Sequence, residues 1–191
     1  MNPEASPDPA SPAAGHDPVL PETGIAIPAL AAALSELLLA RGWMMATAES
    51  CTGGLIAGAC TELPGSSQWF ERGFVTYSNA AKAEVLGVPY ETLDQHGAVS
   101  EAVVLDMASA AVRRSHAQVA VAVSGIAGPG GATPDKPVGL VCFGYAVGKR
   151  VLAESRRFPG DRQAVRLATV QHALFRLAEL VAARPVAAAA R

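Results

Sequence analysis

Apolar residues repeat along this chain with two alternating periods, and this alternation constrains the fold more than any other feature. Residues 29–40 carry leucines at helical spacing, and Gly42 follows where such a helix would end. The apolar run 43–48 is short and bounded, which predicts a buried strand. Residues 51–63 return to helical character and stop at Pro64. The first third of the chain therefore predicts a helix, a strand and a second helix.

The same alternation continues toward the C-terminal end. Runs rich in β-branched and aromatic residues predict strands at 74–77, 119–123 and 138–147. Ser100 is a good N-cap for a helix that runs to about residue 115. The further elements expected are a strand at 151–158 that pairs as a hairpin across Gly148, and a long amphipathic helix at 161–183.

Helices and strands in alternation predict an α/β fold with helices packed on the faces of the sheet. The hairpin makes the sheet mixed rather than all parallel. Residues 1–27 are interrupted by prolines and lack apolar periodicity, so they predict a disordered tail. The Ala-rich end, 185–191, predicts a second tail, which leaves 28–184 as a single domain.

The composition argues against several classes of function. Lys and Arg number 15 against 17 Asp and Glu, for a net charge of -2, and this balance lacks the basic excess of a nucleic-acid-binding protein. The longest apolar runs reach about a dozen residues, short of the roughly 20 that cross a bilayer. The N-terminus lacks a signal-peptide pattern, and three cysteines are an odd number for disulfides. We therefore expect a cytoplasmic protein with free thiols that binds neither membranes nor nucleic acids.

The segment 47–54, TAESCTGG, joins the first predicted strand to the second predicted helix. This junction puts Ser50 at or next to the helix N-cap, at the carboxyl edge of the sheet, where α/β proteins bind ligands. The N–H groups of Cys51, Thr52 and Gly53 lack intrahelical acceptors and are available to an oxyanion or a phosphate. Ser50 is thus a candidate nucleophile, with a simple capping role as the alternative. Cys51 is a rival nucleophile, although the sequence places no histidine to activate it.

A second segment, 71–82, supplies a candidate base. Tyr77 is expected to end a strand, and Asn79 to cap a short helix that carries Lys82 in its first turn. The helix dipole and apolar neighbours both disfavour an ammonium there and lower its pKa. At the reference pKa of about 10.4 only about one lysine in 2,500 is neutral at pH 7, so a base needs such a site. The alternative is a solvated surface lysine.

The third segment, 124–131, is a loop with the sequence SGIAGPGG. Its successive backbone N–H groups can surround an anion, and Ser124, Gly125 and Gly128 are the candidate contacts. The loop is neither a Walker loop nor a dinucleotide-binding fingerprint. A plain connection between strands is the alternative.

Taken together, these segments resemble the C-terminal domain family of the competence/damage-inducible protein CinA. The matching stretches are TAESCTGG at 47–54, GSSQWFERGFVTYSNAAK at 65–82, HGAVSE at 96–101, SGIAGPGGATPDKPVG at 124–139 and GDR at 160–162. The chain is similar to the stand-alone members, which are nicotinamide-nucleotide amidases. The resemblance implies a three-layer α/β/α domain that hydrolyses nicotinamide mononucleotide to nicotinic acid mononucleotide and ammonia, in pyridine nucleotide salvage. It also implies a homo-oligomer that needs no cofactor and no metal.

The resemblance also assigns roles to residues. It implies a catalytic constellation of Ser50 as nucleophile with Tyr77 and Lys82 as its activating partners. The expected substrate-binding residues are Cys51, Thr52, Gly53, Arg72, Asn79, Ser124, Gly125 and Gly128, with Arg72 and the loop as hypothetical ligands of the phosphate and ribose. Two other functions stay open: a non-catalytic nucleotide-binding or scaffolding domain of the same fold, and an amidase for another carboxamide nucleotide.

Overall fold

The computed structural model describes residues 24–184. The tails expected at 1–27 and 185–191 lie outside the described residues, apart from 24–27. The elements, in chain order, are α1 (Ile27–Leu39), β1 (Met45–Glu49), α2 (Leu55–Thr61), the 3-10 turn η1 (Ser66–Gln68), β2 (Phe70–Val75), α3 (Asn79–Ala81), the π-helical turn η2 (Lys82–Leu86), α4 (Tyr90–His96), α5 (Glu101–Arg113), β3 (Val119–Gly125), β4 (Leu140–Val147), β5 (Arg150–Arg157) and α6 (Arg162–Ala182).

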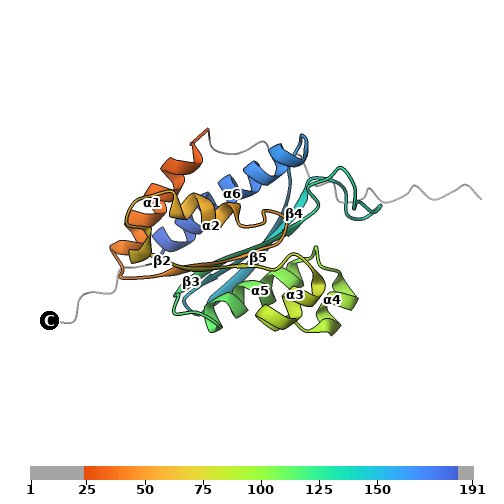
Figure 1. Ribbon diagram of the computed structural model, residues 1–191, viewed down its shortest axis with the longest axis horizontal. Helices are drawn as coiled ribbons and strands as arrows, with labels where there is room; N and C mark the ends of the chain where they lie inside the picture. Colours follow the sequence, from red (N-terminus) through yellow and green to blue (C-terminus); the bar gives the residue numbers. More distant parts are fainter. Residues whose placement is uncertain (1–23, 185–191) are drawn as a thin grey trace, which may run out of the picture.

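The five strands form one mixed sheet in the order β2-β1-β3-β4-β5 (Figure 1). β1 lies parallel to both β2 and β3, whereas β3–β4 and β4–β5 are antiparallel. The predicted hairpin is therefore confirmed, with its turn at Gly148. Because β1 has a parallel neighbour on each side, the chain leaves its carboxyl end at a switch point of the topology, where α/β folds bind ligands.

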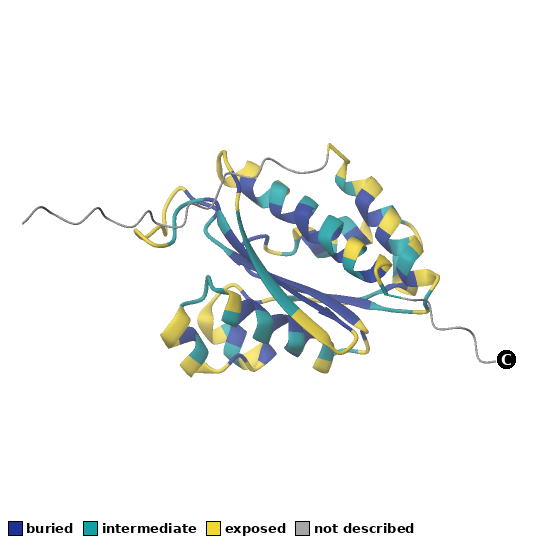
Figure 2. Ribbon diagram, turned by 180° about the vertical axis from the view of Figure 1, so that it is seen from behind, coloured by how far each residue is buried: buried dark blue, intermediate teal, exposed yellow. Residues whose placement is uncertain are grey.

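Helices cover both faces of the sheet, which confirms the three-layer α/β/α fold (Figure 1). α1, α2 and α6 pack on one face, and α3, α4 and α5 on the other. The three central strands, β1, β3 and β4, are buried almost throughout, whereas the edge strands β2 and β5 are partly exposed (Figure 2). The side chains of β1 divide between the two cores, since Met45 faces α1 and α2 while Ala46 and Ala48 face α5. This alternation follows from the strand period of two.

Two of the predicted elements have different bounds in the structure, and one helix was missed. The helix predicted from Cys51 begins only at Leu55, because residues 51–54 form a turn. The strand predicted at 74–77 runs from Phe70 to Val75, so Tyr77 lies two residues beyond its end. α4 was not predicted.

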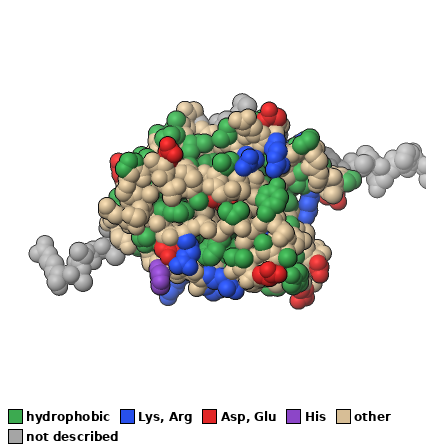
Figure 3. All heavy atoms as spheres, viewed as in Figure 1, with side chains coloured by type: hydrophobic (Ala, Val, Ile, Leu, Met, Phe, Trp, Pro, Cys, Tyr) green, Lys and Arg blue, Asp and Glu red, His purple; other side chains and the backbone are tan. Residues whose placement is uncertain are grey.

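The surface carries no large segregated patch on the face seen in Figure 3, where hydrophobic side chains alternate with charged ones. Within residues 24–184, no helix has both the length and the apolar character to span a bilayer.

Candidate active site

Ser50 and Lys82 meet at the carboxyl end of β1. Ser50 follows the strand directly, and its backbone N–H donates to the Val123 carbonyl of β3 at 3.0 Å. Its side-chain Oγ lies 3.0 Å from Lys82 Nζ. Ser50 keeps 8% of its surface exposed, whereas Lys82 keeps 1%. The hydroxyl is thus within reach of a ligand, while the amine behind it is shielded from water.

The surroundings of the Lys82 amine suit a neutral base. Nζ donates to the backbone carbonyls of Thr76 at 2.9 Å and Tyr77 at 3.4 Å. A neutral amine has two N–H donors and one lone pair, so these carbonyls leave the lone pair for Ser50. Burial lowers the pKa of Lys82. No carboxylate among the described residues forms an ion pair with it that would restore the charged form.

Lys82 begins η2, a turn wound more widely than an α-helix. Such π-helical turns often occur at functional sites. The expectation that Asn79 caps this helical segment was wrong, because the Ser78 hydroxyl accepts from the Ala81 N–H at 3.0 Å. Asn79 is exposed in the first turn of α3.

The N-terminus of α2 is capped by a residue that the sequence analysis did not single out. The expectation that Ser50 lies at or next to the N-cap was wrong, because the N-cap is Gly54, in the left-handed region at φ 97°. The buried Glu49 carboxylate instead accepts the hydrogen bonds of this helix end, from the N–H groups of Gly54, Ile56 and Ala57 and the Thr52 hydroxyl. The signal available in the sequence was an acidic residue at the end of an apolar strand, directly before a helix N-terminus.

Cys51 does not have the surroundings of a nucleophile. Its side chain is buried, and this burial raises the pKa of the thiol to about 12, so the reactive thiolate is strongly disfavoured. No histidine is among the groups that act on its titration. Cys51 is thus a small buried residue of the turn that follows Ser50.

Two backbone amides beside Ser50 donate to no oxygen among residues 24–184. The Gly53 N–H, one of the three considered, donates to the Ser50 carbonyl at 3.1 Å. The N–H groups of Cys51 and Thr52 approach the Cys51 sulfur, and within the described part of the chain they have no oxygen acceptor. These two are therefore the amides suited to a developing negative charge.

Tyr77 approaches Lys82 with its backbone rather than its hydroxyl. Its side chain is 61% exposed, and its hydroxyl accepts a hydrogen bond from Arg162 at 3.1 Å. Arg162, at the start of α6, also donates to the Gly128 carbonyl at 3.1 Å. One guanidinium thus joins the loop after β2 to the Gly-rich loop after β3.

The Gly-rich loop begins beside Ser50, whose backbone N–H donates to the Val123 carbonyl just before the loop. Ser124 is buried and donates to the Ala98 carbonyl at 2.7 Å, so its hydroxyl holds the loop before α5. Gly125 ends β3 next to β4, where an added Cβ would lie 2.8 Å from the Leu140 carbonyl. Ser124 and Gly125 therefore shape the loop through packing and hydrogen bonding.

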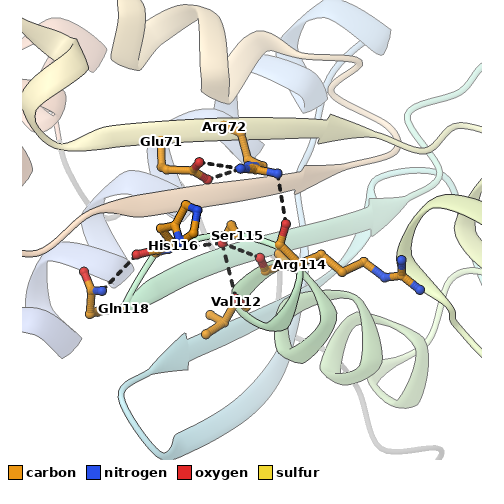
Figure 4. Close-up of polar contacts among 9 residues, drawn as sticks. Glu71, Arg72, Val112, Arg114, Ser115, His116 and Gln118 are labelled. Atoms are coloured by element: carbon orange, nitrogen blue, oxygen red, sulfur yellow. Dashed lines mark hydrogen bonds and ion pairs between the residues drawn. The ribbon is translucent and has the colours of Figure 1, made fainter.

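Arg72 lies away from the other candidates (Figure 4). Its guanidinium pairs with Glu71 and donates to the Arg114 carbonyl at 3.0 Å. In the sheet register Arg72 faces Ala46, about 10 Å before the carboxyl end at 3.3 Å per residue. The structure thus brings Ser50, Lys82 and the Gly-rich loop together, and leaves Arg72 at another part of the sheet.

An open pocket of about 510 Å³ lies at the N-terminus of α6. Its lining includes Leu55, Arg162 and Arg166. Arg166 donates to the Thr52 carbonyl at 2.8 Å, so this pocket adjoins the turn that carries Ser50. Sequence reasoning included Arg162 in a matching stretch without giving it a role, and it missed Arg166. Across residues 24–184, no three His, Cys, Asp or Glu side chains gather in a metal-binding cluster.

Comparisons with known proteins agree with this architecture. The model of the CinA C-terminal domain family matches residues 27–181. The nicotinamide-nucleotide amidohydrolase PncC of Enterobacter agglomerans is 57% identical over 150 residues, which cover 78% of this chain and 89% of that protein. A competence/damage-inducible protein from Agrobacterium tumefaciens has 50% identity and a TM-score of 0.77, with 81% of this chain and 94% of that one covered. The competence damage-inducible protein A of Klebsiella pneumoniae has 39% identity and a TM-score of 0.81, with 83% and 99% covered.

Proposed function

This chain belongs to the CinA C-terminal domain family, and we propose that it is a nicotinamide-nucleotide amidohydrolase. Its substrate in this proposal is nicotinamide mononucleotide, and its products are nicotinic acid mononucleotide and ammonia. The contact of Ser50 Oγ with the buried Lys82 amine, at 3.0 Å, is the observation that carries the reaction. The name of the similar PncC protein supports the choice of carboxamide.

In the acylation step, neutral Lys82 takes the Ser50 proton as Oγ attacks the carboxamide carbon. The direct contact between Ser50 Oγ and Lys82 Nζ supports a proton transfer that does not pass through Tyr77. The N–H groups of Cys51 and Thr52 stabilise the tetrahedral oxyanion, and the loss of one such donor typically costs about 10²–10³ in rate. The ammonium of Lys82 then protonates the leaving nitrogen, and ammonia departs.

Deacylation repeats the same proton transfers with water. Lys82, neutral again, removes a proton from a water molecule that attacks the acyl carbon. The proton returns to Ser50 Oγ as the ester bond breaks, and the carboxylate product leaves. Each turnover thus consumes one water and restores both residues.

The nucleotide moiety is held, in this proposal, by the groups around the mouth of the site. Arg162 and the N–H groups of the Gly-rich loop are suited to a phosphate, because Arg162 already touches that loop at Gly128. Tyr77 completes the site with its carbonyl behind Lys82 and its hydroxyl beside Arg162. Asn79 is exposed at the start of α3, two residues after Tyr77, and stays a proposed ribose or phosphate contact.

We also propose that the protein acts in pyridine nucleotide salvage, in the cytoplasm, as a homo-oligomer. Its three cysteines are free thiols, which fits a reducing compartment. The homo-oligomer is an expectation from the family resemblance.

Ammonia release from nicotinamide mononucleotide by the purified protein tests the reaction. We expect turnover by the parent, and a loss of about 10⁴-fold or more in kcat in both Ser50→Ala and Lys82→Ala, because each removes a member of one unit. Cys51→Ala should retain turnover, since its thiol is buried and protonated.

The opposite pattern, activity in Ser50→Ala and none in Cys51→Ala, would overturn the assignment of the nucleophile. A well-folded parent that binds the nucleotide without releasing ammonia would favour the non-catalytic binding domain. Ammonia release from another carboxamide nucleotide alone would point to a different substrate.

A further inference from the structure

A buried carboxylate directly precedes the candidate nucleophile. Glu49 has no exposed surface, and its two oxygens accept four hydrogen bonds of 2.7 to 3.0 Å. Burial of a carboxylate is costly unless donors or cations compensate it. No cationic side chain of residues 24–184 forms an ion pair with Glu49. One hydroxyl and three backbone amides of the turn and α2 therefore hold its charge.

Glu49 and Ser50 are neighbours at the end of β1, and their side chains point to opposite faces of the sheet. Successive side chains along a strand point to opposite faces of the sheet. Glu49 turns toward α2, whose first amides it binds, whereas Ser50 turns toward Lys82 on η2. The carboxylate thus holds the helix on one face while the hydroxyl meets its base on the other.

The same hydrogen bonds fix the shape of the turn that follows Ser50. Glu49 Oε2 binds both the Thr52 hydroxyl and the Gly54 N–H, so residues 50–53 form a loop closed by the side chain of the residue before it. Because Glu49 accepts the hydrogen bonds at the start of α2, the Ser50 hydroxyl is not needed to cap this helix. Glu49 binds the amides of Gly54, Ile56 and Ala57, and the Cys51 and Thr52 amides beside Ser50 keep no oxygen acceptor among the described residues.

We infer that Glu49 is a positioning residue for the amide hydrolysis proposed above, on which this inference rests. Its carboxylate locks residues 50–53 so that Ser50 Oγ stays against Lys82 and two backbone amides stay open to the oxyanion. Glu49 touches no reacting atom. Glu49 contributes by holding the nucleophile in place, so its loss should lower kcat and leave the affinity for the substrate unchanged.

Two substitutions of Glu49 test this role in the full chain. Glu49→Leu removes all four acceptor contacts, and we expect kcat to fall by about 10²-fold, the effect of a misplacement of about 1 Å. Glu49→Gln can keep the three contacts of Oε2 and sets an NH₂ group against the Ala57 N–H, so its loss should be smaller. KM for nicotinamide mononucleotide should stay within about threefold in both, because the nucleotide contacts lie elsewhere.

Cys60→Ala is the matched control. Cys60 is buried in α2, so its truncation loosens the same helix without touching Glu49 or the turn. We expect Cys60→Ala to lower the melting temperature and to leave kcat unchanged at a temperature where the protein is folded. A kcat loss in Cys60→Ala as large as that in Glu49→Gln, or a rise in KM alone in the Glu49 variants, would overturn the positioning role.

Covalent labelling of Ser50 by a fluorophosphonate separates this inference from the proposed substrate. The probe reports the reactivity of the hydroxyl, whichever amide the enzyme hydrolyses. Slower labelling in Glu49→Gln than in the parent and in Cys60→Ala would support the role of Glu49 even if the parent released no ammonia from the nucleotide. Equal labelling in all three proteins would overturn it.

Discussion

The role proposed for Lys82 as a base depends on the residues that bury its amine. Its amine is buried behind Ser50, and two backbone carbonyls occupy its N–H donors. The desolvation that shields it from water also lowers its pKa and favours the neutral amine. The bond to Ser50 and the depressed pKa thus have one cause, the burial of a side chain at the first position of η2.

The pH dependence of the reaction follows from this burial. A base must be neutral, so kcat/KM should rise with pH through the Lys82 pKa and level off above it. The rise should lie below the reference value of about 10.4, because burial lowers the Lys82 pKa. Initial rates of ammonia release between about pH 5.5 and 9.5 would trace it. A rate that stays flat or falls across this range would contradict a lysine base.

Substitutions of Arg162 and Arg72 test which of the two arginines binds the phosphate. Arg162 contacts both the Gly-rich loop and Tyr77, whereas Arg72 is engaged by Glu71 and Arg114. We expect Arg162→Ala to raise KM by roughly 10- to 100-fold, the equivalent of a lost charged hydrogen bond. Arg72→Ala should leave KM within about twofold. The reverse result, in the same assay, would restore Arg72 as the phosphate ligand predicted from the sequence.

At the scale of elements, β5 and α6 are joined by a partly buried carboxylate. Glu154 of β5 lies 2.6 Å from His172 of α6 and 3.6 Å from Arg176. Burial acts to raise the pKa of Glu154, but the hydrogen bond from His172 and the charges of His172, Arg156 and Arg176 outweigh it and lower the pKa. The carboxylate therefore anchors the last helix to the edge strand.

Glu154→Gln should lower the free energy of unfolding by about 1.5–3 kcal/mol at neutral pH, because hydrogen bonds to a charged group are lost. The depressed pKa gives a stabilisation that is present above the unfolded value of about 4.3 and lost as pH falls through the folded value. Urea unfolding of parent and variant should therefore converge as pH is lowered below about 4.3. Glu179→Gln, at an exposed pair with Arg176, should change stability by less than about 1 kcal/mol. An equal loss in both variants would contradict the anchor.

Sequence patterns correctly predicted the ends of those helices and strands whose capping or turn residues are adjacent in the chain. The Ser100 hydroxyl caps α5 as expected, and Gly148 turns the hairpin. The start of α2 was predicted four residues too early because its cap comes from Glu49, a strand residue whose reach the helical pattern does not contain. α4 is a seven-residue helix with only Leu93 buried, too weak an apolar pattern to predict.

At the scale of the whole molecule, the site combines parts of the chain that sequence alone could not connect. Each of Ser50, Lys82 and the loop after β3 was found within its own segment, and their assembly was implied by the family resemblance. The sheet order β2-β1-β3 accounts for that assembly, because it aligns the carboxyl ends of three parallel strands. The sequence analysis gave Arg162 and Arg166 no role because both lie in α6, far along the chain. They approach the site only in the folded domain.

The hydrogen bond from the Ser50 amide to Val123 connects the turn after β1 to a strand that is synthesised later. The ribosome releases Ser50 and Lys82 well before it releases β3, and β1 has only one of its two neighbours until then. A nascent chain that ends within α5 therefore contains the proposed nucleophile and its proposed base, but not the strand that accepts the hydrogen bond of the Ser50 amide. If Ser50 is the nucleophile, as proposed, we therefore expect hydrolytic activity only in chains that extend past residue 123.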